Sequence, residues 1–284
     1  GALPDCMDVL GRWGDITHVQ NFIVKKDEQI FKNDLRPLVQ NLDSLPFWDR
    51  DIYKKYKLYG HAPGNITHHY GIMTGRGCPY QCSFCFNKAY NRLYQNKGKI
   101  VRRRSARNVI AELLQLKTSE NPAFIPFLDD SFTLPPMAWL FDFLEQYEKE
   151  IQIPFGIITR ADLLNEPLMA RLKKANCYSF KMGVECGNEN FRTKVIQKKV
   201  SNRAIIEAAR LARKYGIKIH TFNMAGCPGE TLDMVFETLD FNKKIRPDFL
   251  WCSLLYPYPR TDIFDLAVES DAIDASSDFH TFDH

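Results

Sequence analysis

From residue 70 onward, strand-like and helix-like patterns of hydrophobic residues alternate along the chain. Short apolar runs predict strands at residues 70–74, 123–128, 155–159, 178–184, 217–224 and 249–255. Helical spacing of apolar residues predicts helices at 105–118, 135–150, 166–174, 201–215, 231–244 and from about 262. Strands that alternate with helices form parallel sheets, and six such units are fewer than the eight of a closed barrel. The pattern predicts an α/β fold, a partial (β/α)6 TIM-like barrel.

The first 66 residues do not repeat this pattern. They predict a short helix and turn at residues 8–15 and a hairpin at 21–31. We therefore expect three parts: an N-terminal linker or extension (residues 1–66), the barrel (67–270) and a C-terminal tail (271–284). The sequence leaves open whether the chain is truncated at that tail.

Composition narrows the class of protein. A hydrophobic content of 45% and a charged content of 25% are typical of globular proteins. No apolar run approaches the roughly 20 residues that span a bilayer, so we expect no membrane association and a cytoplasmic location. The net charge of +4 is small, and nucleic acid is not an expected partner. One basic cluster keeps that alternative open: Lys97, Lys99, Arg102, Arg103, Arg104 and Arg107.

Residues 77–87 carry the most informative chemistry. They bring together Cys78, Cys82 and Cys85, whereas the other five cysteines are scattered singly. Thiolates select soft metal centres such as iron-sulfur clusters or zinc. A structural zinc site normally has four protein ligands, so three cysteines favour a cluster with one open iron. A non-catalytic zinc or iron-sulfur module remains the alternative.

Polar residues follow the predicted strands where each one ends. These residues are Asp129 and Asp130, Arg160, Glu185, and the segment from Gly226 to Glu230. Taken singly, each could be a helix cap or an ordinary ion pair. Because the carboxyl ends of parallel strands meet at one edge, we expect them to converge with the cysteines.

The C-x3-C-x2-C spacing, with Phe84 before the last cysteine, resembles the cluster loop of radical S-adenosylmethionine (SAM) enzymes. The order of the later motifs is also similar to that family. The resemblance implies that Cys78, Cys82 and Cys85 hold a [4Fe-4S] cluster and that SAM chelates the fourth iron. Reduction would then cleave SAM to a 5'-deoxyadenosyl radical.

The same resemblance implies contacts with SAM. Asp129 and Asp130 would bind its ammonium group, and Arg160 its carboxylate. Glu185 would contact the ribose or the methionyl end. Phe84 would lie near the adenine, beside a wall formed by Gly226 to Glu230.

Residues 42–50, with the sequence Leu-Asp-Ser-Leu-Pro-Phe-Trp-Asp-Arg, resemble the linker that precedes the barrel in cobalamin-dependent radical SAM proteins. The Asp-x-His-x-x-Gly signature of cobalamin ligation does not occur in the sequence, so participation of cobalamin stays open. The resemblance implies methyl transfer or another transformation at an unactivated carbon of a small molecule. It also implies a one-electron reductant such as flavodoxin or ferredoxin. Modification of tRNA or protein is the remaining alternative.

Overall fold

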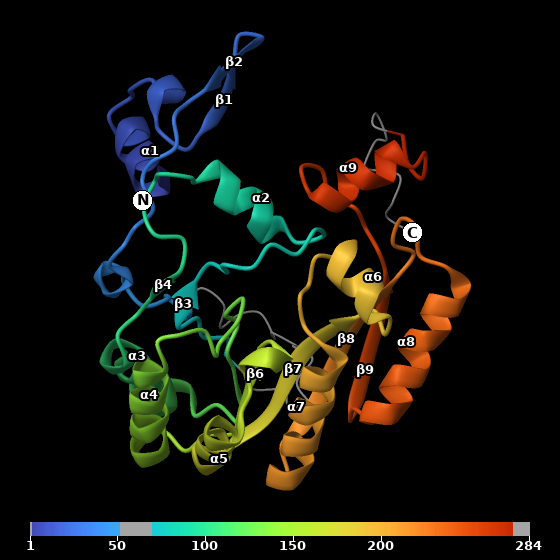
Figure 1. The fold of residues 1–284 in the computed structure, drawn as a ribbon. Coiled ribbons are helices and arrows are strands. Elements are labelled where there is room, and N and C mark those ends of the chain that lie inside the picture. The colour runs from blue at the N-terminus through green and yellow to red at the C-terminus, as the bar shows by residue number, and fades with distance from the viewer. Residues whose placement is uncertain (1, 52–69, 275–284) are drawn as a thin grey trace.

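A parallel sheet of five strands lies at the centre of the fold (Figure 1). The computed structural model describes residues 2–51 and 70–274. The strand order is β5-β6-β7-β8-β9, with every neighbouring pair parallel. Their bounds are β5 Ile125–Pro126, β6 Phe155–Ile158, β7 Cys177–Glu185, β8 Lys218–Ala225 and β9 Phe249–Leu254. The sheet is the curved, open part of a barrel, which confirms the predicted fold class.

The first predicted strand, residues 70–74, joins the sheet through one bridge only, between Ile72 and Phe127. Ile72 N donates to Pro126 O at 3.0 Å, but Thr74 N donates to the carboxylate of Asp129 instead of to a neighbouring strand. The side chain therefore ends the ladder. The chain continues in a short antiparallel pair, β3 (Gly75–Arg76) with β4 (Arg102–Arg103).

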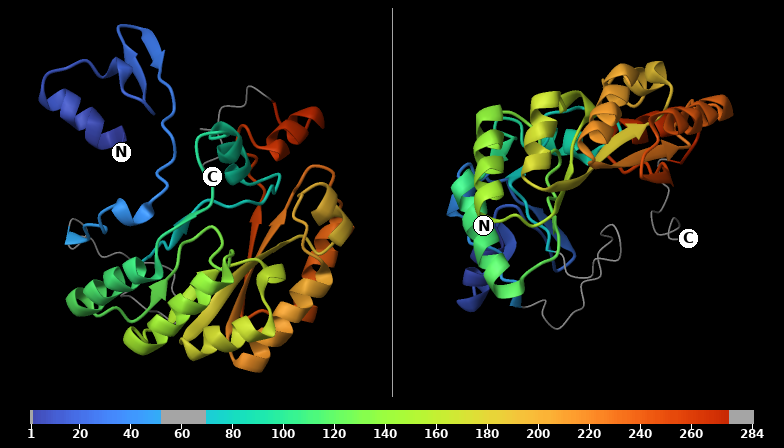
Figure 2. Two further views of the ribbon diagram at one scale, coloured as in Figure 1. Left: turned by 60° about the vertical axis from the view of Figure 1, so that its left-hand side comes forward. Right: turned by 90° about the horizontal axis from the view of Figure 1, so that it is seen from below.

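Five helices follow the strands and lie on the same side of the sheet (Figures 1 and 2). They are α3 (Ala106–Glu120), α4 (Met137–Glu150), α5 (Glu166–Lys174), α7 (Asn202–Tyr215) and α8 (Leu232–Ile245). Ser105 and Ser201 cap α3 and α7 as expected, and Gly216 ends α7 with a φ of 61°. On β7, Phe180, Met182 and Val184 are buried against these helices. The alternate residues of the strand consequently face the inside of the open barrel.

The N-terminal part holds helix α1 (Ala2–Gly11) and a hairpin of β1 (Ile23–Lys26) and β2 (Gln29–Lys32). The hairpin was predicted correctly. The helix and turn predicted at residues 8–15 are confirmed in part: the helix ends at Gly11 and a turn follows, with Trp13 at a φ of 56°, but the helix already begins at Ala2. The predicted boundary at residues 66–67 lies outside the described residues. The division into three parts stays a prediction.

Shorter helices surround the open end of the sheet. Neither α2 (Phe86–Leu93) nor α6 (Glu189–Lys194) was expected, whereas α9 (Asp262–Glu269) was. Short 3-10 helices lie at Ile16–His18, Leu42–Ser44 and Ala161–Leu163.

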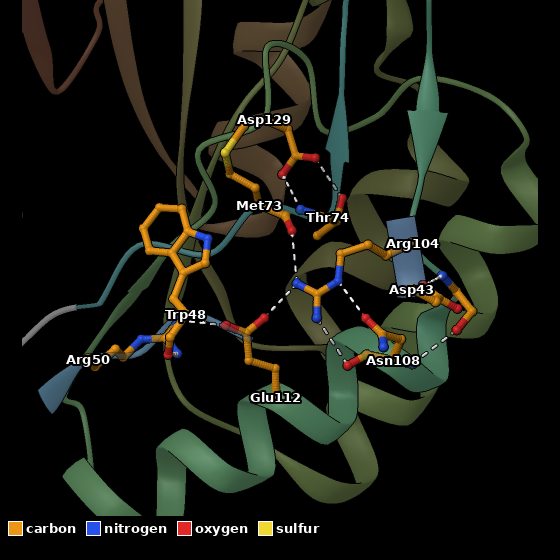
Figure 3. Close-up of polar contacts among 10 residues, drawn as sticks. Asp43, Trp48, Arg50, Met73, Thr74, Arg104, Asn108, Glu112 and Asp129 are labelled. Atoms are coloured by element: carbon orange, nitrogen blue, oxygen red, sulfur yellow. Dashed lines mark hydrogen bonds and ion pairs between the residues drawn. The ribbon is translucent and has the colours of Figure 1, made fainter. Parts of the chain in front are cut away.

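The linker-like residues 42–50 dock on α3 (Figure 3). Asp43 Oδ1 accepts a hydrogen bond from Ser105 N at 2.9 Å. Glu112 lies between two arginines, with Oε1 2.7 Å from Arg50 Nη2 and Oε2 2.5 Å from Arg104 Nη1. A buried ion network therefore fastens this segment to the barrel.

Three arginines of the predicted basic cluster form hydrogen bonds or ion pairs with other parts of the protein. Arg102 Nη1 donates to Val39 O at 3.1 Å, and Arg103 Nη2 donates to Leu134 O at 3.0 Å. Arg104 belongs to the network with Glu112. These three side chains are engaged internally, which favours the structural interpretation of the cluster.

Candidate metal and cofactor site

The three clustered cysteines lie in the loop between β3 and α2. Cys82 is buried, while Cys78 and Cys85 are partly exposed. Burial raises the pKa of Cys78 to about 11, and negative charge on Asp130, Cys85 and Cys82 also raises it. The thiols are thus close enough to influence one another.

Asp129 and Asp130 hold the two sides of the cysteine loop. Asp129 accepts hydrogen bonds from Thr74 N at 3.2 Å and Thr74 Oγ1 at 2.7 Å (Figure 3). Asp130 accepts from Gly77 N at 3.1 Å and from Asn87 Nδ2 at 2.8 Å. Both carboxylates therefore help to build the loop. Their contact with the SAM ammonium group stays a prediction.

Arg160 lies beside the loop, between an acid and an aromatic ring. Its Nε and Nη2 donate to Asp162 at 3.0 and 2.9 Å, and its guanidinium carbon is 3.6 Å from the ring centre of Tyr80. Its Nη1 takes part in neither of the hydrogen bonds to Asp162. That nitrogen leaves room for the predicted contact with a carboxylate, because guanidinium groups bind such anions in a fork geometry.

Glu185 is paired with Lys198 at the end of β7. Glu185 Oε1 lies 2.7 Å from Lys198 Nζ, and each side chain is 8% exposed. The pair rests over Gly183, where a Cβ atom would overlap both charged groups. Burial raises the pKa of Cys82, and the charges of Lys198 and Arg160 lower it. The two cations thus favour the thiolate form that a cluster needs.

Phe84 and the segment after β8 form one wall. Phe84 packs against an apolar cluster that includes Cys186 and Cys227. Glu230 Oε2 accepts from Gly226 N at 2.7 Å and Cys227 N at 3.2 Å. Gly226 has a φ of 82°, which glycine adopts without strain. Phe84 thus packs against the apolar cluster to which Cys227 belongs, and the contacts of Phe84, Gly226 and Glu230 with adenine stay a prediction.

The donor set, three thiols on one loop, suits a soft metal centre such as an iron-sulfur cluster. Within residues 2–51 and 70–274, no group of three or more His, Cys, Asp or Glu side chains is arranged to hold one metal ion. A cubane cluster places its thiolates on different irons, so they need not share one point. Three thiols on one loop, with Lys198 and Arg160 beside Cys82, suit such a cluster. Ligation by Cys78, Cys82 and Cys85 stays a prediction.

Sequence reasoning missed several residues of this site. Tyr80 lies inside the cysteine loop, and its aromatic type was the only available signal. Lys198 comes from a basic stretch without regular periodicity. Asn91 Nδ2 donates to Cys78 O at 2.9 Å from the unexpected helix α2, so no pattern in the sequence pointed to it.

A sequence profile of the radical SAM superfamily matches residues 72–241. The chain belongs to the radical SAM superfamily. The match confirms the predicted family and enzyme class, and it favours the radical SAM interpretation over a zinc module. The family's cofactors, a [4Fe-4S] cluster and SAM, are the predicted ones.

Curated proteins with similar sequences include a methyltransferase and a cyclase. An uncharacterized methyltransferase of Pyrococcus horikoshii is 27% identical over 274 residues, covering 96% of this chain and 57% of that protein. The anaerobic magnesium-protoporphyrin IX monomethyl ester cyclase of Rubrivivax gelatinosus is 24% identical, with coverages of 84% and 41%. The chain thus spans about half the length of these relatives.

Solved structures share the fold. The radical SAM methyltransferase TsrM from Kitasatospora setae aligns with a TM-score of 0.75 at 17% identity, covering 98% of this chain and 55% of TsrM. The cobalamin-dependent radical SAM enzyme OxsB aligns with a TM-score of 0.72 at 20% identity, with coverages of 96% and 44%. The alignments include the N-terminal part as well as the barrel.

Proposed function

We propose that this chain binds a [4Fe-4S] cluster through Cys78, Cys82 and Cys85, and binds SAM beside it. The bound cluster and SAM would supply a one-electron cleavage that yields a radical able to act on an unactivated carbon. The observation that carries the proposal is the cysteine loop itself. It is fixed at the carboxyl edge of the sheet, next to Arg160 and the pair of Glu185 and Lys198.

The residues around the loop would have separate tasks. Asp129 and Asp130 hold the loop in place, and Lys198 and Arg160 stabilise negative charge on Cys82. Arg160 Nη1 would orient the carboxylate of SAM. Phe84 and Gly226 to Glu230 would exclude water from the adenine side.

We further propose that the reaction is a methyl transfer or a related carbon-centred change in which cobalamin takes part. The names of the Pyrococcus horikoshii relative and of TsrM support methyl transfer, and OxsB supports cobalamin. The docked residues 42–50 support it too, because they resemble the linker of that subfamily. The sequence holds no Asp-x-His-x-x-Gly motif, so this chain would not supply that ligand.

The expected partners are a small-molecule substrate and a one-electron reductant such as flavodoxin or ferredoxin. In the part of the chain that the structure describes, no helix is long and apolar enough to cross a membrane. All eight cysteines are free thiols, which fits a reducing compartment and the proposed cytoplasmic location.

The test is anaerobic reconstitution with iron and sulfide, followed by reduction and an assay for 5'-deoxyadenosine. We expect visible absorption from a cluster and cleavage of SAM. Cys82→Ala should lose both, whereas Cys252→Ala, an exposed cysteine outside the loop, should lose neither. A loaded, reduced protein that never cleaves SAM, or one that binds only zinc, would overturn the proposal.

A further inference from the structure

The inner face of the sheet carries two basic side chains, Lys181 and His220, side by side below the cysteine site. Lys181 on β7 is paired in register with His220 on β8, and His220 is paired with Phe249 on β9. The ring centres of His220 and Phe249 are 5.5 Å apart. Lys181 faces away from the helices because its neighbours Phe180 and Met182 are buried against them.

No acid neutralises this pair among the described residues. The ammonium group of Lys181 makes no ion pair or hydrogen bond with the described residues, and Ile158, its register partner on β6, is apolar. Asp248 is the one acid whose charge reaches His220, but its carboxylate already binds Lys218 Nζ at 2.7 Å and Ile219 N at 2.9 Å. Lys181 therefore offers positive charge, and both side chains offer hydrogen-bond donors, to an anion from outside the chain.

The surroundings of Lys181 and His220 disfavour the charged form of each side chain. Burial lowers the pKa of Lys181. Burial, followed by the charge of Lys181, lowers the pKa of His220. A bound anion would reverse both effects, because it stabilises the charged forms.

An apolar wall lies between this pair and the cysteine site. One step toward the mouth, Gly183 is paired with Phe222, and Phe222 with Trp251. Trp251 is 52% exposed and Phe249 49% exposed, so this wall is open to a ligand. Gly183 adds no side chain, and Glu185 with Lys198 lies above it. Lys181 and Glu185 are four strand positions apart, which corresponds to roughly 13 Å.

We propose that this inner face binds the substrate, and that the substrate is a small molecule with an apolar, preferably aromatic, body and one anionic group, a carboxylate or phosphate. The anion lies at Lys181 and His220. The body lies against Phe222, Phe249 and Trp251, and the opposite end points toward the cysteine loop. The inference rests on the proposed function in taking this ligand to be the substrate.

The experiment compares two fluorescent probes that differ in charge. 8-Anilinonaphthalene-1-sulfonate is an aromatic anion, and N-phenyl-1-naphthylamine is its uncharged counterpart. Each is titrated into the chain before any cluster is loaded. We expect Lys181→Met to raise the Kd of the anionic probe at least about tenfold and to leave the Kd of the neutral probe within about twofold. Trp251→Ala should weaken both probes.

Two controls keep the test decisive. Lys149→Met removes an exposed lysine on helix α4 that is already paired with Glu145, and it should change neither Kd. Lys181→Arg keeps the charge and should retain the anionic probe. If Lys181→Met fails to fold, added salt on the unmodified chain replaces it, and salt should weaken the anionic probe alone.

An anionic probe that binds Lys181→Met as tightly as the unmodified chain would overturn the inference. Equal weakening of both probes would overturn its anionic part. The two proposals fail separately. A chain that cleaves SAM without charge-dependent probe binding overturns only this inference, and a chain that binds the anion but never cleaves SAM overturns only the proposed function.

Discussion

Replacing Glu112 by glutamine tests how residues 42–50 are held against the barrel. Glu112 has a side chain only 4% exposed and bridges Arg50 and Arg104 (Figure 3). Arg104 Nη1 also donates to Met73 O at 3.1 Å, next to Thr74, which binds Asp129. The carboxylate therefore connects the linker-like segment to the strand end that supports the cysteine loop.

The expected loss of stability follows from this geometry. Glutamine keeps the shape but removes the charge, and it leaves two largely buried guanidinium groups without a counter-ion. Breaking a buried pair in this way costs about 3–5 kcal/mol. Glutamine keeps one acceptor oxygen but turns an NH2 donor toward the other arginine, so one charged hydrogen bond, worth about 1.5–3 kcal/mol, is lost outright and an unpaired guanidinium is left behind. We therefore expect Glu112→Gln to lower the free energy of unfolding by about 3–5 kcal/mol.

Glu145→Gln provides the matched control. Glu145 lies on the neighbouring helix α4 and also pairs with a cation, Lys149 at 2.7 Å, but these side chains are 52% and 67% exposed. Water screens such a pair, so the control should leave stability unchanged within error. The measurement is urea unfolding followed by circular dichroism. The reasoning is refuted if the midpoint of Glu112→Gln falls no further than that of Glu145→Gln.

Two more predictions concern the inner face. Gly183→Ala should destabilise the protein by about 1–3 kcal/mol in urea unfolding, because the methyl group overlaps Glu185 and Lys198. Gly11→Ala, whose Cβ would meet nothing within 4 Å, is the control, and equal midpoints would contradict this account. For His220, burial and then Lys181 lower the pKa below 6.5, so its contribution is complete above that pH and is lost as the pH falls through the folded-state pKa. Between pH 7 and 5 the stability of the unmodified chain should therefore fall more than that of His220→Gln, and parallel curves would argue against it.

The sequence predicted the order of the strands and helices well, because periodicity and caps such as Ser105 and Gly216 are local signals. It placed the polar strand ends on one edge, since parallel topology decides that edge. The sequence did not predict which side chains pair with each other. Whether Glu185 pairs with Lys198 depends on a loop conformation without periodicity, and the early end of the first strand depends on a side chain, Asp129, from 55 residues away.

These pairings divide the inner face into two electrostatic regions. Near the cysteine loop two cations already have an acid, Arg160 with Asp162 and Lys198 with Glu185. An anion that approaches them competes with a carboxylate, except at Arg160 Nη1. Among residues 2–51 and 70–274, no acid forms an ion pair with Lys181 that an anion would have to displace. An anionic ligand consequently gains most by reaching Lys181, and a zwitterion such as SAM is better matched to the paired charges above it.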